Sequence, residues 1–184
     1  MKFFDNYFIK MIDGLQSVDK KLLEVAVKSL MEVSAGGGKV IIAGNGGSAA
    51  MASHTAVDLT KNAQVRSINF NESDLITCFA NDFGYEKWIE KSLEYYADPG
   101  DSVILISSSG SSINILNAAD KAKKMGLKLI TFSGFSPDNQ LRDKGDLNFY
   151  VNSEEYNIVE MSHHIWLVAM VDRIIDLRSV SSSI

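Results

Sequence analysis

The chain has 184 residues, of which 46% are hydrophobic and 22% are charged, an ordinary balance for a folded globular protein. Its formal net charge of -5 excludes a strong overall attraction to nucleic acid or to an anionic membrane. A single cysteine, Cys78, excludes an internal disulfide and fits a reducing compartment. No run of apolar residues approaches the length that spans a membrane, and we read no signal peptide in the first residues. We therefore expect one soluble, cytoplasmic domain over residues 1–184.

Residues 1–35 show two helical patterns with many apolar side chains. Apolar residues recur at helical spacing from Phe4 to Leu15, and again from Leu22 to Met31. Two such helices are more than a sheet needs for cover. We therefore predict that they form an oligomer interface, with simple packing on the sheet as the alternative.

Strands and helices alternate through residues 36–178, which form the predicted core. Short β-branched runs predict five strands, at residues 39–44, 66–70, 101–107, 127–134 and 147–151. Helices are predicted up to about residue 61, over most of 73–97, over 112–125 and from about 156 to 178, followed by a polar tail at 179–184. This alternation predicts an α/β fold of three layers, in which helices cover both faces of a five-stranded parallel sheet.

Two glycine- and serine-rich loops follow the first and third predicted strands. They read GNGGSA over residues 44–49 and SSSGSS over residues 107–112, and each runs directly into a helix. Glycine lets the backbone approach a ligand, the first helical N–H groups are unpaired, and serine hydroxyls donate to phosphate oxygens. If the strand order is 2-1-3-4-5, both loops line one crevice. The sequence therefore predicts a site for a phosphate monoester.

A dinucleotide-binding turn is the alternative interpretation of the first loop. Gly44, Gly46 and Ala49 fit the G-x-G-x-x-A pattern, and Glu72 lies near the end of the second strand. That fold has no use for a second, serine-rich loop, and helix capping would explain one serine but not the three at 107–109. The pair of loops favours the monoester.

Three ordered motifs resemble those of the sugar isomerase (SIS) domain family, and within it the bacterial phosphoheptose isomerases. They read AGNGGSAA over 43–50, FANDFGYE over 79–86 and ISSSGSSINIL over 106–116. The likeness extends from about residue 20 to residue 178. It implies a flavodoxin-like sheet, a homotetramer built through the terminal helices, and conversion of sedoheptulose 7-phosphate to a heptose 7-phosphate for lipopolysaccharide precursors.

The resemblance also implies the substrate-binding residues. Contacts with the substrate, its hydroxyls and its phosphate fall on Asn45, Gly46, Gly47, Ser48, Asn81, Asp82, Ser107, Ser108, Ser109 and Ser112. Among these, Asn81 and Asp82 are expected at the sugar hydroxyls. The serines are expected to hold the phosphate, which agrees with the independent expectation from the two loops.

The catalytic positions match the family less well. The family uses a histidine and a glutamate four residues apart on one helix, here His54 and Asp58, which share a helix face. From the last helix it takes the glutamine and second histidine of a Q-E-x-H-x-x-x-x-H pattern. Aligning Glu160 with that pattern places Val159 and Leu167 at these two positions, and neither can transfer a proton or bind a metal.

His163 falls on the same helical stripe as the two missing groups, so we predict it as a displaced general acid or metal ligand. Asp58 is the predicted base, with His54 or His163 as acid, and the three together form a candidate site for Zn²⁺. An ordinary interfacial histidine is the alternative for His163. His164 points about 100° away and is expected to be structural or interfacial, while Glu160 is a second carboxylate within reach or a helix cap.

The prediction is a phosphosugar isomerase that takes a sugar phosphate as its substrate and assembles as a homotetramer. The rival is a phosphosugar-binding regulatory protein without catalysis, resembling a tetrameric family member that binds the replication initiator. Asp58 and His163 favour the enzyme, whereas Val159 and Leu167 favour the binding protein.

Overall fold

The computed structural model describes residues 2–181. The helices are α1 (Lys2–Gln16), α2 (Lys20–Ala35), α3 (Gly47–Lys61), α4 (Ser73–Phe83), α5 (Trp88–Tyr96), α6 (Ile113–Lys124) and α7 (Tyr156–Ser181). The strands are β1 (Val40–Gly44), β2 (Ser67–Asn69), β3 (Ser102–Ser107), β4 (Lys128–Ser133) and β5 (Leu147–Tyr150). The predicted elements are thus present, but α7 continues into the predicted polar tail as far as Ser181. The last residues of that tail, 182–184, lie outside the described residues.

The five strands form one parallel sheet in the order β2-β1-β3-β4-β5, as the sequence predicts. The order reverses between β1 and β3, which are neighbours, and Gly44 at the end of β1 is in register with Ile106 in β3. The loops that follow these two strands therefore leave the same edge of the sheet side by side.

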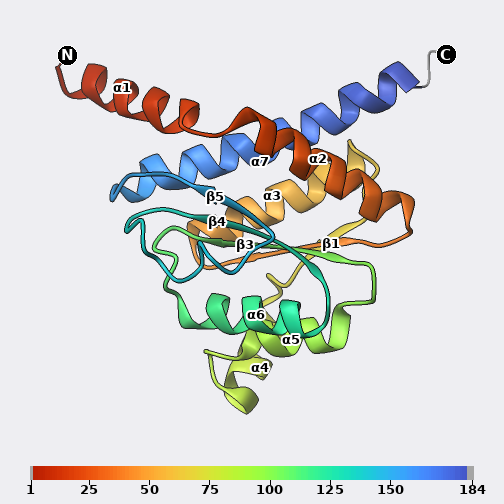
Figure 1. The fold of residues 1–184 in the computed structure, drawn as a ribbon. Coiled ribbons are helices and arrows are strands. Elements are labelled where there is room, and N and C mark those ends of the chain that lie inside the picture. The colour runs from red at the N-terminus through yellow and green to blue at the C-terminus, as the bar shows by residue number, and fades with distance from the viewer. Residues whose placement is uncertain (1, 182–184) are drawn as a thin grey trace.

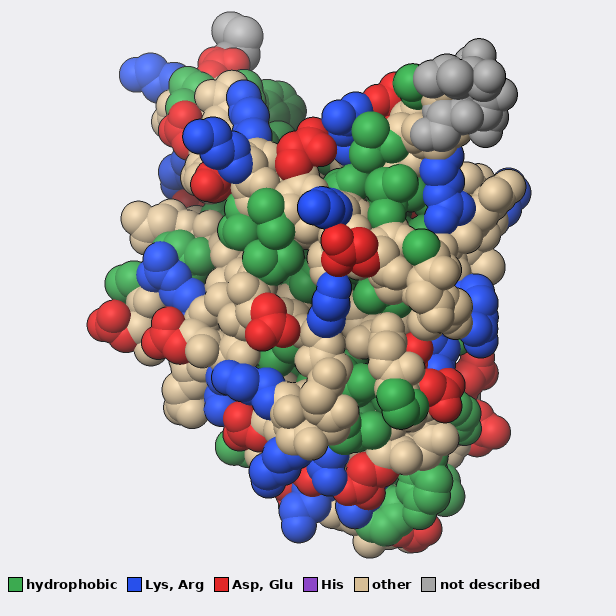
Figure 2. Space-filling model, turned by 45° about the vertical axis from the view of Figure 1, so that its right-hand side comes forward, with side chains coloured by type: hydrophobic (Ala, Val, Ile, Leu, Met, Phe, Trp, Pro, Cys, Tyr) green, Lys and Arg blue, Asp and Glu red, His purple; other side chains and the backbone are tan. Residues whose placement is uncertain are grey.

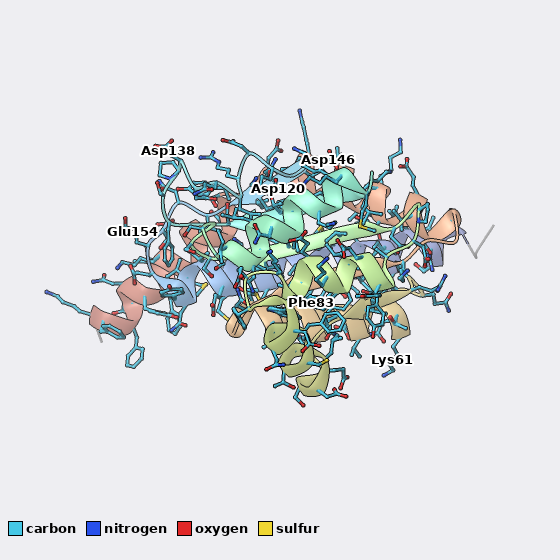
Figure 3. All side chains as sticks on the ribbon, turned by 90° about the horizontal axis from the view of Figure 1, so that it is seen from below. Lys61, Phe83, Asp120, Asp138, Asp146 and Glu154 are labelled. Atoms are coloured by element: carbon cyan, nitrogen blue, oxygen red, sulfur yellow. The ribbon has the colours of Figure 1, made fainter. Side chains whose placement is uncertain are left out.

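Helices cover both faces of the sheet (Figure 1). One layer holds α2, α3 and α7, and α1 packs on α7 and extends beyond the sheet. The other layer holds α4, α5 and α6. Figure 3 shows this second layer from below, with Phe83 at the end of α4 and Asp120 on α6.

Both faces of the sheet are buried, which explains why the strands are apolar without interruption. Alternate residues of one strand enter two different cores: Ile42 and Ile104 pack under α2, α3 and α7, and Ile41 and Val103 pack over α5 and α6. A strand that is covered on both faces holds few polar residues, and in β3 these are its two end residues, Ser102 and Ser107. The polar loops at the ends of β1 and β3 are therefore where ligand chemistry can gather.

Within residues 2–181, no helix is both long and apolar enough to span a bilayer. On the face shown in Figure 2, acidic and basic side chains are interspersed rather than gathered by sign.

Candidate active site

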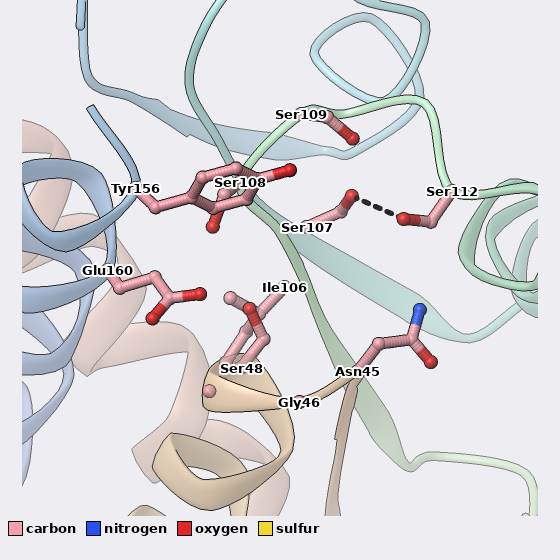
Figure 4. A pocket seen from close by; sticks show the side chains of 11 residues that line it. Asn45, Gly46, Ser48, Ile106, Ser107, Ser108, Ser109, Ser112, Tyr156 and Glu160 are labelled. Atoms are coloured by element: carbon pink, nitrogen blue, oxygen red, sulfur yellow. Dashed lines mark hydrogen bonds between the residues drawn. The ribbon is translucent and has the colours of Figure 1, made fainter. Parts of the chain in front are cut away.

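A cavity of about 270 Å³ lies where β1 and β3 end. The two predicted loops supply most of its wall, and the first turns of α7 close the opposite side (Figure 4). Its lining residues are Asn45, Gly46, Gly47, Ser48, Ile106, Ser107, Ser108, Ser109, Ser112, Tyr156 and Glu160. All four predicted phosphate-binding serines and the four predicted loop residues from 45 to 48 thus meet in one place.

The serine loop presents hydroxyl groups with few partners of their own. Ser107 and Ser112 hydrogen-bond each other through their Oγ atoms at 3.2 Å, as drawn in Figure 4. Ser108 Oγ is buried without any hydrogen-bond partner. Ser112 is the N-cap residue of α6, yet its side chain does not cap the helix. The hydroxyl of Ser108 is thus unpaired, and those of Ser107, Ser109 and Ser112 bond only within the loop. Beside an uncapped helix N-terminus, such hydroxyls form a site that an anion can satisfy.

The glycine loop brings a second helix N-terminus to the same cavity. Gly46 has φ of 54°, a conformation that favours glycine, and no side chain caps the start of α3. At Gly44, an added Cβ would meet backbone atoms of Ser48 at 2.8 Å and 2.9 Å. Both glycines therefore permit the tight turn that leads from β1 into α3 at the cavity wall.

Asn45 is held in place by a buried neighbour. Its amide forms two reciprocal hydrogen bonds with the amide of Asn114, at 3.0 Å and 2.8 Å, and Asn114 is only 2% exposed. The hydroxyl of Tyr85 donates a third bond to Asn45 Oδ1 at 3.0 Å. The sequence motifs contain Asn114 and Tyr85, but neither residue is assigned to the site from the sequence alone.

A histidine pair joins α3 to α7, with His164 one helical turn beyond Glu160 of the cavity wall. His54 Nε2 lies 3.2 Å from Asp58 Oδ2, and His54 Nδ1 lies 2.8 Å from His164 Nε2. Burial, and then the nearby His54, lower the pKa of His164, while Asp58 acts in the opposite direction. His164 is therefore neutral at pH 7, and the pair can share and pass a proton.

The prediction that His163 faces this site is wrong. His163 is fully buried, and its Nε2 hydrogen-bonds the backbone carbonyl of Ser133 at 3.0 Å. Burial lowers its pKa to about 4, so it stays neutral at physiological pH. The stripe of Val159, His163 and Leu167 is indeed one helix face, but that face packs into the core.

The face of α7 that meets the site is shifted by one residue from the predicted one. It carries Tyr156 and Glu160 in the cavity wall and His164 against His54. Tyr156 and His164 have the same eight-residue spacing as the glutamine and second histidine of the family pattern. The polar stripe that Val159 and Leu167 seemed to remove is therefore present, with different side chains. His164, expected to be structural or interfacial, belongs to the site.

The donor set predicted for zinc is not assembled. His54 and Asp58 are neighbours, but His163 is on the buried side of α7. Among residues 2–181, no three side chains of histidine, cysteine, aspartate or glutamate are grouped so that they could hold a metal. Since zinc in catalytic sites takes three protein ligands, this chain by itself does not fit the ion, and no step below uses one.

Asn81 and Asp82, the predicted contacts to sugar hydroxyls, lie near the end of α4 and are exposed. They hydrogen-bond each other at 2.9 Å and do not line the serine cavity. Their contact with substrate stays a prediction. The same motif instead reaches the site through Tyr85.

Known proteins resemble this chain over most of its length. Residues 4–134 match the family model of the SIS domain. The phosphoheptose isomerase of Thermodesulfovibrio yellowstonii is 37% identical over 80% of this chain and 74% of that protein. The probable phosphoheptose isomerase of Thermoplasma volcanium is 31% identical over 88% of this chain and 84% of that protein. In structure, a phosphoheptose isomerase from Francisella tularensis superposes with a TM-score of 0.87, at 24% identity over 96% of this chain and 97% of that chain.

Proposed function

Because the chain belongs to the SIS domain family, we propose that it is a phosphosugar isomerase that interconverts a ketose phosphate and an aldose phosphate, with sedoheptulose 7-phosphate as the first candidate substrate. The observation that carries this proposal is that α7 links two groups of residues. Glu160 of α7 lines the serine cavity at the end of β3, and His164, one helical turn further along α7, is hydrogen-bonded to His54 of α3, which lies beside Asp58.

The chain's own residues supply what an isomerisation needs. The serine loop fixes the phosphate end, which holds the reacting carbons in place and lowers the entropic cost of the reaction. A base must then remove a proton next to the carbonyl, and an acid must protonate the carbonyl oxygen. Helices α3 and α7 offer two carboxylates, Asp58 and Glu160, and the hydrogen-bonded imidazoles of His54 and His164. Asp58 is the base that the sequence predicts.

The proposed homo-oligomer assembles through the terminal helices. Several large apolar side chains of α1 and α7 are exposed, namely Phe3, Phe4, Phe8, Ile9, Ile12, Met161 and Ile165. Apolar surface gathered in this way marks protein–protein contact in soluble proteins. Sedimentation equilibrium should give the mass of a tetramer for the wild type and a smaller mass for Phe8→Glu. A wild type that sediments as a monomer at micromolar concentration would contradict the proposal.

A direct assay separates the isomerase from a binding protein without catalysis. The pure protein is incubated with sedoheptulose 7-phosphate and a panel of other ketose phosphates, and the aldose product is followed by NMR. The isomerase reading predicts product with at least one sugar. Binding of the sugars without any product would favour the alternative, in which the serine cavity only senses a phosphosugar.

A further inference from the structure

One carboxylate has no assigned task, although it faces the serine cavity. Glu160 is the one acidic residue in the cavity wall, and its side chain is half-buried. Within residues 2–181 it has no hydrogen bond and no ion pair. Its carboxylate lies at the start of α3, where the helix dipole favours a negative charge, and both of its oxygens remain available to a ligand.

The opposite wall of the cavity leaves room for this carboxylate. An ideal Cβ placed on Gly47 would collide with Glu160 Oε2 and would lie 2.8 Å from Cδ. Only glycine at 47 lets the carboxylate rest on the start of α3, beside the loop that shapes the cavity. The two positions, far apart in the sequence, fit each other.

Asp58 is less suited to act as the base. Its Oδ1 accepts a hydrogen bond from Asn62 Nδ2 at 3.1 Å, and its Oδ2 faces His54 Nε2 at 3.2 Å. Both oxygens therefore already have a partner, whereas the oxygens of Glu160 have none. Asp58 is also absent from the cavity wall, and the rise of α3 puts it about 16 Å beyond Gly47.

We propose that Glu160 is the general base of the isomerisation and that Asp58 instead orients His54. This inference rests on the proposed isomerase function. His164 lies one turn after Glu160 on α7 and is hydrogen-bonded to His54 at 2.8 Å. The histidine pair is thus the acid that lies nearest to this base along the helix.

The proton and electron movements balance without a co-reactant. When the ketose is the substrate, the Glu160 carboxylate takes a proton from C1. The C–H electrons form the C1=C2 bond, and the electrons of the C2 carbonyl move to O2. The histidine pair protonates O2, which gives the enediol. The pair then takes the proton of the C1 hydroxyl, C1=O forms, and Glu160 returns its proton to C2, which restores the starting state of the enzyme.

The test uses Glu160→Gln, which keeps the shape of the side chain and removes its basicity and charge. Wild type and variant are incubated in D₂O with the ketose phosphate that the wild type turns over, and deuterium at C1 and C2 is followed by NMR. Removing a general base is expected to slow exchange about 100-fold or more. Affinity for the sugar phosphate, measured by calorimetry, should stay unchanged or rise, because the variant removes a negative charge from the cavity that takes an anion.

Two controls keep the outcomes distinct. Glu155→Gln changes a surface carboxylate of the segment that precedes α7, which pairs with Lys10 at 2.6 Å, and should leave exchange at the wild-type rate. Asp58→Asn tests the predicted alternative base. Exchange in Glu160→Gln within threefold of wild type would overturn the proposal. So would a parallel fall in affinity and exchange, which would make Glu160 a ligand of sugar hydroxyls. If the wild type exchanges no deuterium at C1 or C2 with any sugar phosphate, the proposed isomerase function itself is wrong.

Discussion

His163 should make the protein less stable in mild acid. In the folded protein, burial lowers the pKa of His163 from 6.5 to about 4. At a pH between these two pKa values, His163 is protonated in the unfolded chain and neutral in the folded chain. The free energy of unfolding must therefore rise with pH from 4 to 6.5. Above pH 6.5 the contribution of His163 to it is constant.

The magnitude follows from the size of the shift. A change from 6.5 to about 4 corresponds to about 3 kcal/mol in total, all of which is lost below pH 4. Between pH 7 and pH 5 the expected loss is about 2 kcal/mol. Because His163 is fully buried, solvent screening does not reduce this figure.

Urea unfolding at pH 7 and pH 5 measures the effect. His163→Gln keeps a side-chain N–H for the carbonyl of Ser133 and removes the titrating ring. The variant should be less sensitive to this pH change than the wild type by about 2 kcal/mol. His54→Gln, which changes an exposed histidine, is the matched control and should keep most of the wild-type dependence. An equal pH dependence in wild type and His163→Gln would refute the buried, neutral assignment.

Three further substitutions probe the site. Ser107→Ala removes a hydroxyl of the anion site and should raise KM for the sugar phosphate about tenfold or more, with kcat little changed in steady-state assays. Gly47→Ala should displace the carboxylate of Glu160 and lower kcat by about 100-fold, while calorimetry shows an unchanged Tm because only a flexible side-chain end must move. Asn114→Ala removes the buried partner of Asn45 and should lower the free energy of unfolding by about 1–3 kcal/mol in urea titrations. A wild-type KM in the first variant, a wild-type kcat in the second or wild-type stability in the third would each contradict the contact concerned.

The sheet and the anion site could be predicted from sequence because local patterns determine both. Buried parallel strands are short, β-branched and uninterrupted, and the loops at 44–49 and 107–112 follow two of them directly. Once the strand order is 2-1-3-4-5, the two loops must meet at one edge. Few other arrangements of the chain satisfy those patterns.

Matching a family pattern could not predict which face of α7 meets the cavity. Moving the pattern by one residue turns a helix face by about 100°, which exchanges the core for the site. The apolar residues of α7 held the missing signal, since Val159, Trp166, Leu167 and Met170 define a buried stripe that includes position 163. A histidine inside such a stripe is expected to be buried. His164 and Glu160, beside the stripe, were the better candidates.

Contacts between distant segments were beyond the sequence for a different reason. The amide pair of Asn45 and Asn114, and the fit of Glu160 against Gly47, depend on side-chain positions in three dimensions. Each partner taken alone looks like an ordinary loop or helix residue.

Deuterium incorporation by the wild-type protein tests the central claim most directly. The protein is incubated with sedoheptulose 7-phosphate in D₂O, and the carbon-bound protons at C1 and C2 are followed by NMR. An isomerase with a carboxylate base beside the serine cavity should incorporate deuterium at these carbons and form the aldose 7-phosphate. Saturable binding of the sugar phosphate without any deuterium at C1 or C2, with this or any other ketose phosphate, would contradict the account.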